Sequence, residues 1–194
     1  ADHEVWNFQE SIRKVIDYFY EKPFLSYLEE LTGIKNLKSD YSYNWGAGFH
    51  VLPKGGFLNV HKDFNIHPHN GYIRKLNLLL YLNKDWEYKE GGSLELWVMS
   101  KEQKIEDIVP KFNRCVIFDT GEKSWHGNPR KVTYNDQTRM SLSLYYYLDF
   151  DNKNNLPKAH TTIYRDLPGQ YTNFLRKYFG FVKNFIPKQL KNVL

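Results

Sequence analysis

The N-terminal part of the chain has apolar residues at helical spacing. The residues that would share one side of a helix are Val5, Phe8, Ile12, Val15, Ile16, Phe19 and Tyr20. A period of three to four residues predicts amphipathic helix over residues 5–32. Pro23 favours a division into two helices, and Gly33 stands where a helix is expected to end.

From residue 43 to residue 148 the pattern changes to short apolar or alternating runs separated by glycine. These runs are 46–51, 55–60, 75–82, 92–98, 114–118 and 140–148. Alternation is typical of strands with one buried face, and turns at fairly regular intervals favour an all-β sandwich or barrel. We therefore expect a mainly β fold with flanking helices.

The composition indicates a single globular domain. Of the 194 residues, 41% are hydrophobic, 25% charged and 17% aromatic, which suits a strand-rich body with a full core. No run approaches the ~18 apolar residues of a membrane span. The single cysteine, Cys115, lies in the apolar run 115–118. We therefore expect a core residue, no intrachain disulfide, and a reducing, cytoplasmic location.

The net charge of +5 is concentrated at the C-terminal end. Residues 171–194 contain five basic side chains and no acidic one. Apolar residues recur there at helical spacing, which predicts a terminal helix with its apolar face on the core and its basic face in water. Binding of nucleic acid or of an anionic surface by this basic face is the less favoured alternative.

His61 and Asp63 are the most informative polar residues of the β region. Residues that are two apart on an extended segment point to the same face. His126 follows 65 residues later, a separation that suits strands brought together in a barrel. Two imidazoles and one carboxylate are the ligands of mononuclear non-haem Fe(II) sites with open coordination positions. The alternative is a chance H-x-D in which a buried histidine is hydrogen-bonded to the aspartate.

A second polar set alternates along the last predicted strand. The residues that would share one face of this strand are Arg139, Ser141, Ser143 and Tyr145. An arginine inside a barrel requires an anionic partner, because guanidinium groups form bidentate pairs with carboxylates. A bound acid could supply this partner, and so could a core acidic residue such as Glu95.

The order His61-x-Asp63, His126, Arg139-x-Ser141 resembles that of the iron(II)- and 2-oxoglutarate-dependent oxygenases, and most closely that of the prolyl hydroxylases. Other segments look like their counterparts in the oxygen-sensing prolyl hydroxylases, namely 81–86, 91–94 and 108–114.

The resemblance implies a double-stranded β-helix, or jelly roll, as the core of one domain over residues 1–194. The core would occupy 43–148, with N-terminal helical support at 5–35 and a C-terminal helical segment at 168–194. The spacing between the second histidine and the arginine is longer than in the related prolyl hydroxylases. We therefore expect an extended hairpin at 128–137.

The resemblance also assigns roles to single residues. His61, Asp63 and His126 would bind Fe(II), and Arg139 would pair with the distal carboxylate of 2-oxoglutarate. Together with O2, these groups would form the catalytic centre.

Further residues would complete the cosubstrate pocket. Tyr81 and Ser141 would hydrogen-bond the same distal carboxylate, which would otherwise be costly to bury. Asn77 and Leu79 share the strand face of Tyr81 and would line the pocket.

The implied activity is hydroxylation of a prolyl residue in a peptide or protein, with oxidative decarboxylation of 2-oxoglutarate to succinate and CO2. Ascorbate is a candidate reductant. One alternative is an oxygenase acting on a small metabolite, sugar or free amino acid. A remote alternative from another class is a non-catalytic jelly-roll binding module. The sequence carries no signature of oligomeric state.

Four residues are candidates for a position facing the substrate: His50, His67, Trp125 and Tyr145. His67 lies in a loop marked by proline and glycine, so a solvated loop is the main alternative for it. His50 could instead fill the first strand, and Trp125 could be part of the core.

Overall fold

The computed structural model describes residues 9–40, 46–149 and 157–167. Residues up to Tyr164 belong to one compact unit, and a second unit begins at Arg165. The predicted C-terminal helical segment lies outside the described residues, so the single-domain organisation of the whole chain stays a prediction. Within the described residues, we find no helix with the length and apolar character needed to cross a membrane.

Two helices precede the sheets, α1 (Glu10–Tyr20) and α2 (Lys22–Thr32). Pro23 lies in the first turn of α2, where a missing backbone N–H is tolerated. Gly33 ends this helix with a φ of 72°, a left-handed conformation that glycine adopts without a Cβ clash. The predicted division into two helices and the predicted stop are therefore confirmed, while residues 5–8 of the predicted helix lie outside the described residues.

Ten strands and one 3-10 turn follow among the described residues. Their bounds are β1 (Leu37–Ser39), β2 (Gly48–Leu52), β3 (Leu58–Lys62), β4 (Ile73–Tyr81), η2 (Tyr88–Glu90), β5 (Leu94–Val98), β6 (Gln103–Ile108), β7 (Cys115–Asp119), β8 (Trp125–Asn128), β9 (Arg139–Leu148) and β10 (Ile163–Tyr164). Each of the six predicted runs overlaps a strand. Four strands were missed: β1, β6, β8 and β10. Three of them are only two to four residues long, and β6 begins with four exposed residues and shows no alternation.

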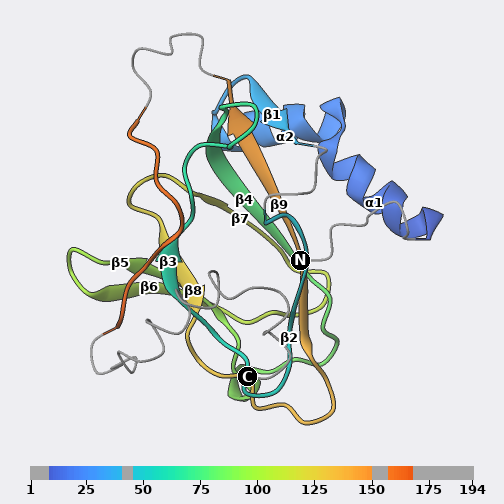
Figure 1. Ribbon diagram of the computed structural model, residues 1–194. Helices are drawn as coiled ribbons and strands as arrows, with labels where there is room; N and C mark the ends of the chain where they lie inside the picture. Colours follow the sequence, from blue (N-terminus) through green and yellow to red (C-terminus); the bar gives the residue numbers. More distant parts are fainter. Residues whose placement is uncertain (1–8, 41–45, 150–156, 168–194) are drawn as a thin grey trace, which may run out of the picture. The chain divides into compact units, whose positions relative to one another are not determined.

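The strands form two five-stranded antiparallel sheets (Figure 1). The β9 sheet has the order β1-β9-β4-β7, with β2 also paired to β9. The β3 sheet has the order β10-β3-β8-β5-β6. Strands that are neighbours in space are mostly distant in sequence, as in a jelly roll. The expected mainly β, jelly-roll architecture is confirmed.

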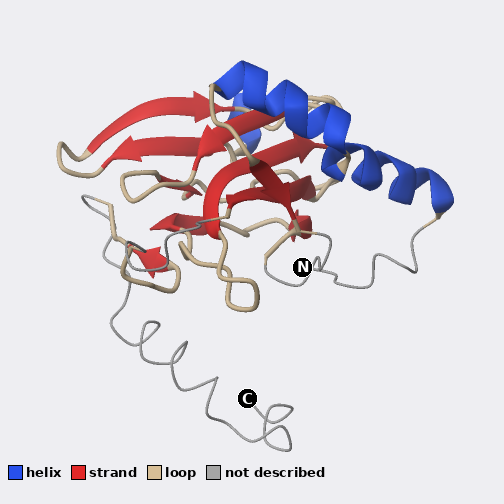
Figure 2. Ribbon diagram, turned by 90° about the horizontal axis from the view of Figure 1, so that it is seen from above, coloured by secondary structure: helices blue, strands red, loops and turns tan. Residues whose placement is uncertain are grey.

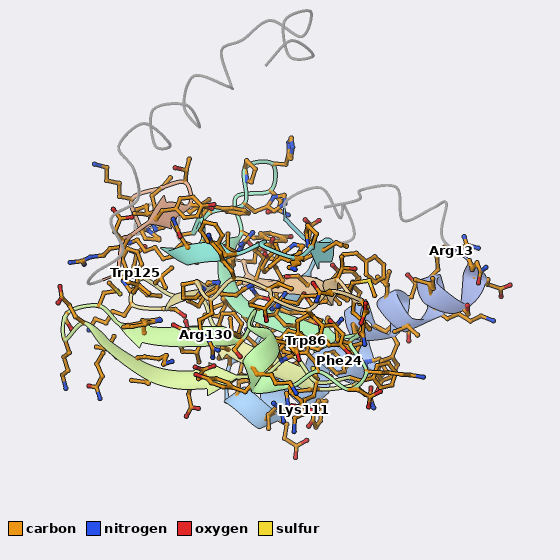
Figure 3. The ribbon with its side chains drawn as sticks, turned by 90° about the horizontal axis from the view of Figure 1, so that it is seen from below. Arg13, Phe24, Trp86, Lys111, Trp125 and Arg130 are labelled. Atoms are coloured by element: carbon orange, nitrogen blue, oxygen red, sulfur yellow. The ribbon has the colours of Figure 1, made fainter. Side chains whose placement is uncertain are left out.

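The helices cover the outer face of the β9 sheet (Figure 2). The buried residues of this layer are Ile16, Tyr20, Phe24 and Leu28 from the helices and Leu37, Leu76, Leu78, Leu142, Leu144 and Tyr146 from the sheet. Figure 3 labels Arg13 of α1 and Phe24 of α2. Because strand residues alternate between faces, this apolar outer face leaves the intervening residues of β4 and β9 to line the inner face.

Two expectations from the sequence are wrong. Cys115 is exposed rather than part of the core, because it opens β7 at the edge of the β9 sheet. The long connection at 129–138 contains no strand and forms no hairpin. Its backbone is paired with other loops instead: the Gly55 N–H donates to the Val132 carbonyl (2.7 Å), and the Gly92 N–H donates to the Arg130 carbonyl (3.0 Å).

Candidate functional site

His61 and His126 lie directly opposite each other on the neighbouring strands β3 and β8. Their ring centroids are 4.5 Å apart. Asp63 follows the end of β3, and one ligand atom from each of the three residues lies within 4.8 Å of the others. All three side chains are buried. The structure therefore brings the predicted triad together as one candidate metal site.

The second nitrogen of each histidine ring is held by the backbone. His61 Nδ1 lies 2.8 Å from the Asn59 carbonyl, and His126 Nδ1 lies 3.3 Å from the Ser124 carbonyl. A carbonyl can only accept, so each Nδ1 carries a proton, and Nε2 is the ring nitrogen left to face a metal. These Nε2 atoms lie 3.6 and 3.5 Å from the two Asp63 oxygens. Two nitrogen donors and a carboxylate thus converge on one point, as a divalent iron site requires.

The protonation states also suit a metal. Burial lowers the pKa of His126 to about 4, so its ring is neutral at neutral pH. Burial alone would raise the pKa of the Asp63 carboxyl, but contacts with the two imidazoles and Arg74 hold it well below its ordinary value. At neutral pH the site therefore offers an anionic carboxylate and a neutral His126 imidazole without first releasing a proton.

Arg139 is a buried cation with no acidic partner among the described residues. Its Nε donates to the Gly92 carbonyl (2.6 Å), and its Nη1 lies 3.5 Å from Ser141 Oγ. The alternative partner, Glu95, instead accepts from Trp97 Nε1 (2.9 Å) and lies 3.5 Å from Lys104 Nζ. Burial lowers the pKa of Arg139, which reflects the cost of an uncompensated charge.

Tyr81 accompanies this cation. Its ring centroid lies 5.2 Å from Arg139 Cζ, and the side chain is completely buried. Its hydroxyl has no hydrogen-bond partner of normal geometry among the described residues. The Arg139 guanidinium has no counter-ion among the described residues, and the Tyr81 hydroxyl beside it has no well-formed hydrogen bond. A bound carboxylate would supply both.

One cavity of about 250 Å³ connects the triad with Arg139. Strand register explains its polar wall, because cross-strand partners share a face. His50 and Tyr81 both pair with Ser141, and Leu79 pairs with Ser143. The predicted residues that line this cavity are His50, His61, Asp63, Asn77, Leu79, His126, Arg139, Ser141 and Tyr145.

Three predicted residues do not line the cavity, namely Tyr81, which is buried beside Arg139, Trp125 and His67. Trp125 precedes His126 on β8, so it lies on the opposite face of the strand from the metal site. Its ring centroid lies 6.0 Å from Lys62 Nζ. His67 is buried rather than solvated, with Nε2 2.8 Å from Asp40 Oδ2. Its ring also contacts Tyr147 edge-on. The loop that carries His67 is thus fixed against the β9 sheet.

Other residues of the site were not anticipated. Asn128 lines the cavity two residues after His126, and that even spacing could have revealed it. Gly92 supplies the carbonyl for Arg139 and has a φ of +66°. Arg74 contacts Asp63, with Nη1 3.3 Å from Oδ2.

Comparisons with curated proteins show short regions of similarity. Human Egl nine homolog 1 is 35% identical over 79 residues, which cover 40% of this chain and 17% of that protein. Human prolyl hydroxylase EGLN3 is 32% identical over 79 residues, 40% of this chain and 31% of that protein. Mouse prolyl 3-hydroxylase OGFOD1 is 27% identical over 78 residues, 38% of this chain and 14% of that protein. The chain thus matches less than a third of the length of each relative.

A solved prolyl 4-hydroxylase structure from Phytophthora capsici has a TM-score of 0.50 and 20% sequence identity, covering 91% of this chain and 55% of that one. This similarity supports the jelly-roll fold. The family model described as the 2OG-Fe(II) oxygenase superfamily matches residues 47–147, more than half of the 194, and includes the triad and Arg139. The chain belongs to the 2OG-Fe(II) oxygenase superfamily.

Proposed function

We propose that this protein is an Fe(II)- and 2-oxoglutarate-dependent hydroxylase. The observation that carries the proposal is the cavity itself. It has a two-histidine, one-carboxylate site at one end and, at the other, a buried arginine that has no acidic partner among the described residues. A dicarboxylate that contacts a metal through one end would meet a cation with the other. A non-catalytic module would not require both features.

His61, Asp63 and His126 would hold Fe(II) in this proposal. When bound, ferrous iron would supply the chemistry by which O2, 2-oxoglutarate and a substrate C–H group are converted to succinate, CO2 and the hydroxylated substrate. Arg139 would bind the distal carboxylate through its planar fork, and Ser141 would donate a further hydrogen bond.

The remaining walls would orient the cosubstrate and exclude water. Tyr81 would donate its hydroxyl to the same carboxylate, and Asn77 and Leu79 would line the pocket between the two ends. His50 and Tyr145 also line the cavity and are candidates for contact with the substrate. Exclusion of water strengthens the charge pairing of Arg139 with an anion.

For the substrate we propose a prolyl residue in a peptide or protein. The support is that two of the curated relatives carry prolyl hydroxylation in their names, EGLN3 and OGFOD1. A small metabolite, sugar or free amino acid is the alternative outcome of the substrate test below.

The first test is anaerobic addition of Fe(II) and 2-oxoglutarate to the protein. We expect the visible absorption band of iron chelated by a keto acid, and loss of that band in Asp63→Ala. Glu106→Ala is the control, because Glu106 is an exposed carboxylate of the edge strand β6. Absence of the band in the unmodified protein would contradict the proposed cofactors.

The second test addresses the substrate. With Fe(II), 2-oxoglutarate, O2 and ascorbate as reductant, we expect succinate release to increase when proline-containing peptides are added. Mass spectrometry should then find one added oxygen atom on proline. Stimulation by small metabolites alone, with unmodified peptides, would replace the prolyl substrate by the alternative.

A further inference from the structure

Arg74 is a buried arginine held between two aromatic rings. Its guanidinium carbon lies 3.5 Å from the ring centroid of Phe64 and 3.6 Å from that of Tyr145. Only 2% of the residue is exposed. A planar cation that is stacked on both faces can present its N–H groups only at its edge. That edge includes Nη1, which lies 3.3 Å from Asp63 Oδ2.

A β-bulge places Arg74 on the cavity face of β4. Arg74 pairs with Tyr147, whereas Leu76 pairs with Tyr146, so Lys75 is an extra residue without a partner in the register. Without this bulge, Arg74 would share the outer face with Leu76. Lys75 instead forms an ion pair with Asp119. The bulge therefore directs one of two adjacent cations toward the metal site.

Arg74 is the charged neighbour that could orient the Asp63 carboxylate. Two of the three ion-pair contacts described for it are with imidazoles, and Arg74 is the only permanently charged group among the three. A buried carboxylate is costly unless a cation compensates it. A guanidinium fixed by stacking also favours the orientation of the carboxylate in which Oδ2 faces Nη1.

We propose that Arg74 is a positioning residue for the metal ligand Asp63. Clamped by Phe64 and Tyr145, it holds the Asp63 carboxylate facing the Nε2 atoms of both histidines, so that the ligand set is formed before metal arrives. This inference rests on the proposed function, since it concerns the same metal site. Groups that orient metal ligands in this way typically change metal affinity by about 10–100-fold when removed.

The test measures metal binding rather than turnover. Co(II) is titrated into Arg74→Lys and Arg74→Met by calorimetry, and its visible absorption spectrum is recorded. We expect both variants to bind Co(II) at least about tenfold more weakly, with an altered spectrum. The lysine variant separates geometry from charge, because it keeps the cation and loses the planar stack. Lys75→Met is the matched control and should leave affinity and spectrum unchanged.

Wild-type affinity and spectrum in both Arg74 variants would overturn the inference. The unmodified protein and Asp63→Ala are measured in parallel: if the unmodified protein itself fails to bind Co(II), the proposed function fails instead. Circular dichroism of the metal-free proteins checks folding. If the Arg74 variants do not fold, Phe64→Leu replaces them as the test of the inference, because it removes one of the two rings that hold the guanidinium. It should weaken Co(II) binding about two- to fivefold, and unchanged binding would overturn the inference.

Discussion

At the residue scale, the cavity contains one buried charge that has an oppositely charged neighbour and one that has none among the described residues. Asp63 is an anion whose neighbours already compensate it, with Arg74 at 3.3 Å. Arg139 is a cation whose partners among the described residues are a carbonyl, a hydroxyl and the Tyr81 phenol, none of them an acid. A neutral partner compensates a buried charge less well than an opposite charge does. Arg139 is therefore the group in the cavity that gains most from a bound anion.

Substitution of Arg139 should affect 2-oxoglutarate far more than metal. We expect the dissociation constant for 2-oxoglutarate, measured by calorimetry on the Co(II)-loaded protein, to rise at least about tenfold in Arg139→Lys and further in Arg139→Met, because lysine keeps the charge and loses the fork. Co(II) affinity should be retained. Arg130→Met is the control, since Arg130 stacks on Tyr88 at 4.0 Å and does not line the cavity. Unchanged 2-oxoglutarate binding in Arg139→Met would exclude its assigned role.

Single residues were predictable where their spacing was regular. The faces of His61 on β3 and Arg139 on β9 could be assigned from the alternation of these strands, and that of Asp63 from its spacing of two from His61. Arg74 could not be assigned in this way, because the bulge at Lys75 inverts the parity of β4. His67 was not predictable as buried, since its partner Asp40 belongs to a distant segment that no local pattern connects to it.

At the element scale, β4 and β9 are the shared wall between core and cavity. Eight register pairs join them, from Ile73 with Leu148 to Tyr81 with Ser141. The alternation of apolar and polar residues predicted β4 and β9 correctly. Alternation could not predict β6, because this strand lies at the edge of its sheet and its first four residues are all exposed. Loops were least predictable, since the backbone pairing of 129–138 with Gly55 and Gly92 leaves no signature in side-chain pattern.

Gly92 and Gly33 allow a matched comparison of two left-handed positions. In Gly92→Ala, with φ +66°, the new Cβ would lie 2.8 Å from Arg139 Cδ and 3.1 Å from Val132 Cγ2. We expect a loss of ~1–2 kcal/mol in unfolding free energy and weaker 2-oxoglutarate binding, because Arg139 must shift. Gly33→Ala, with φ +72° and nothing within 4 Å of its Cβ, should cost about 1 kcal/mol and leave binding unchanged. Urea unfolding and calorimetry give both quantities. Equal 2-oxoglutarate affinities in the two variants would refute the coupling of Gly92 to Arg139.

At the scale of the whole molecule, the two ends of the cavity belong to different sheets. His61 and His126 lie on the β3 sheet, and Asp63 follows β3 directly, so a metal ion would contact one sheet only. Arg139 and Ser141 lie on β9 in the opposite sheet. A dicarboxylate held at both ends would therefore connect the two sheets, whereas metal or dicarboxylate alone would not.

This arrangement predicts cooperative stabilisation by the two ligands. Mn(II), which binds without oxidation in air, should raise the melting temperature, because a ligand present at a hundred times its dissociation constant stabilises by about 2.7 kcal/mol, or roughly 5–10 °C for a domain of this size. 2-Oxoglutarate alone should have little effect, because only its distal end finds a partner. Together the two should raise the melting temperature by more than the sum of their separate shifts, since the bound metal completes the second attachment point. Removing the metal with EDTA should reverse the increase seen with Mn(II) alone and the increase seen with both ligands. Asp63→Ala should show neither increase. If 2-oxoglutarate stabilised the metal-free protein as strongly as the metal-loaded one, its binding would not depend on the metal. The dicarboxylate would then not connect the two sheets through the metal ion.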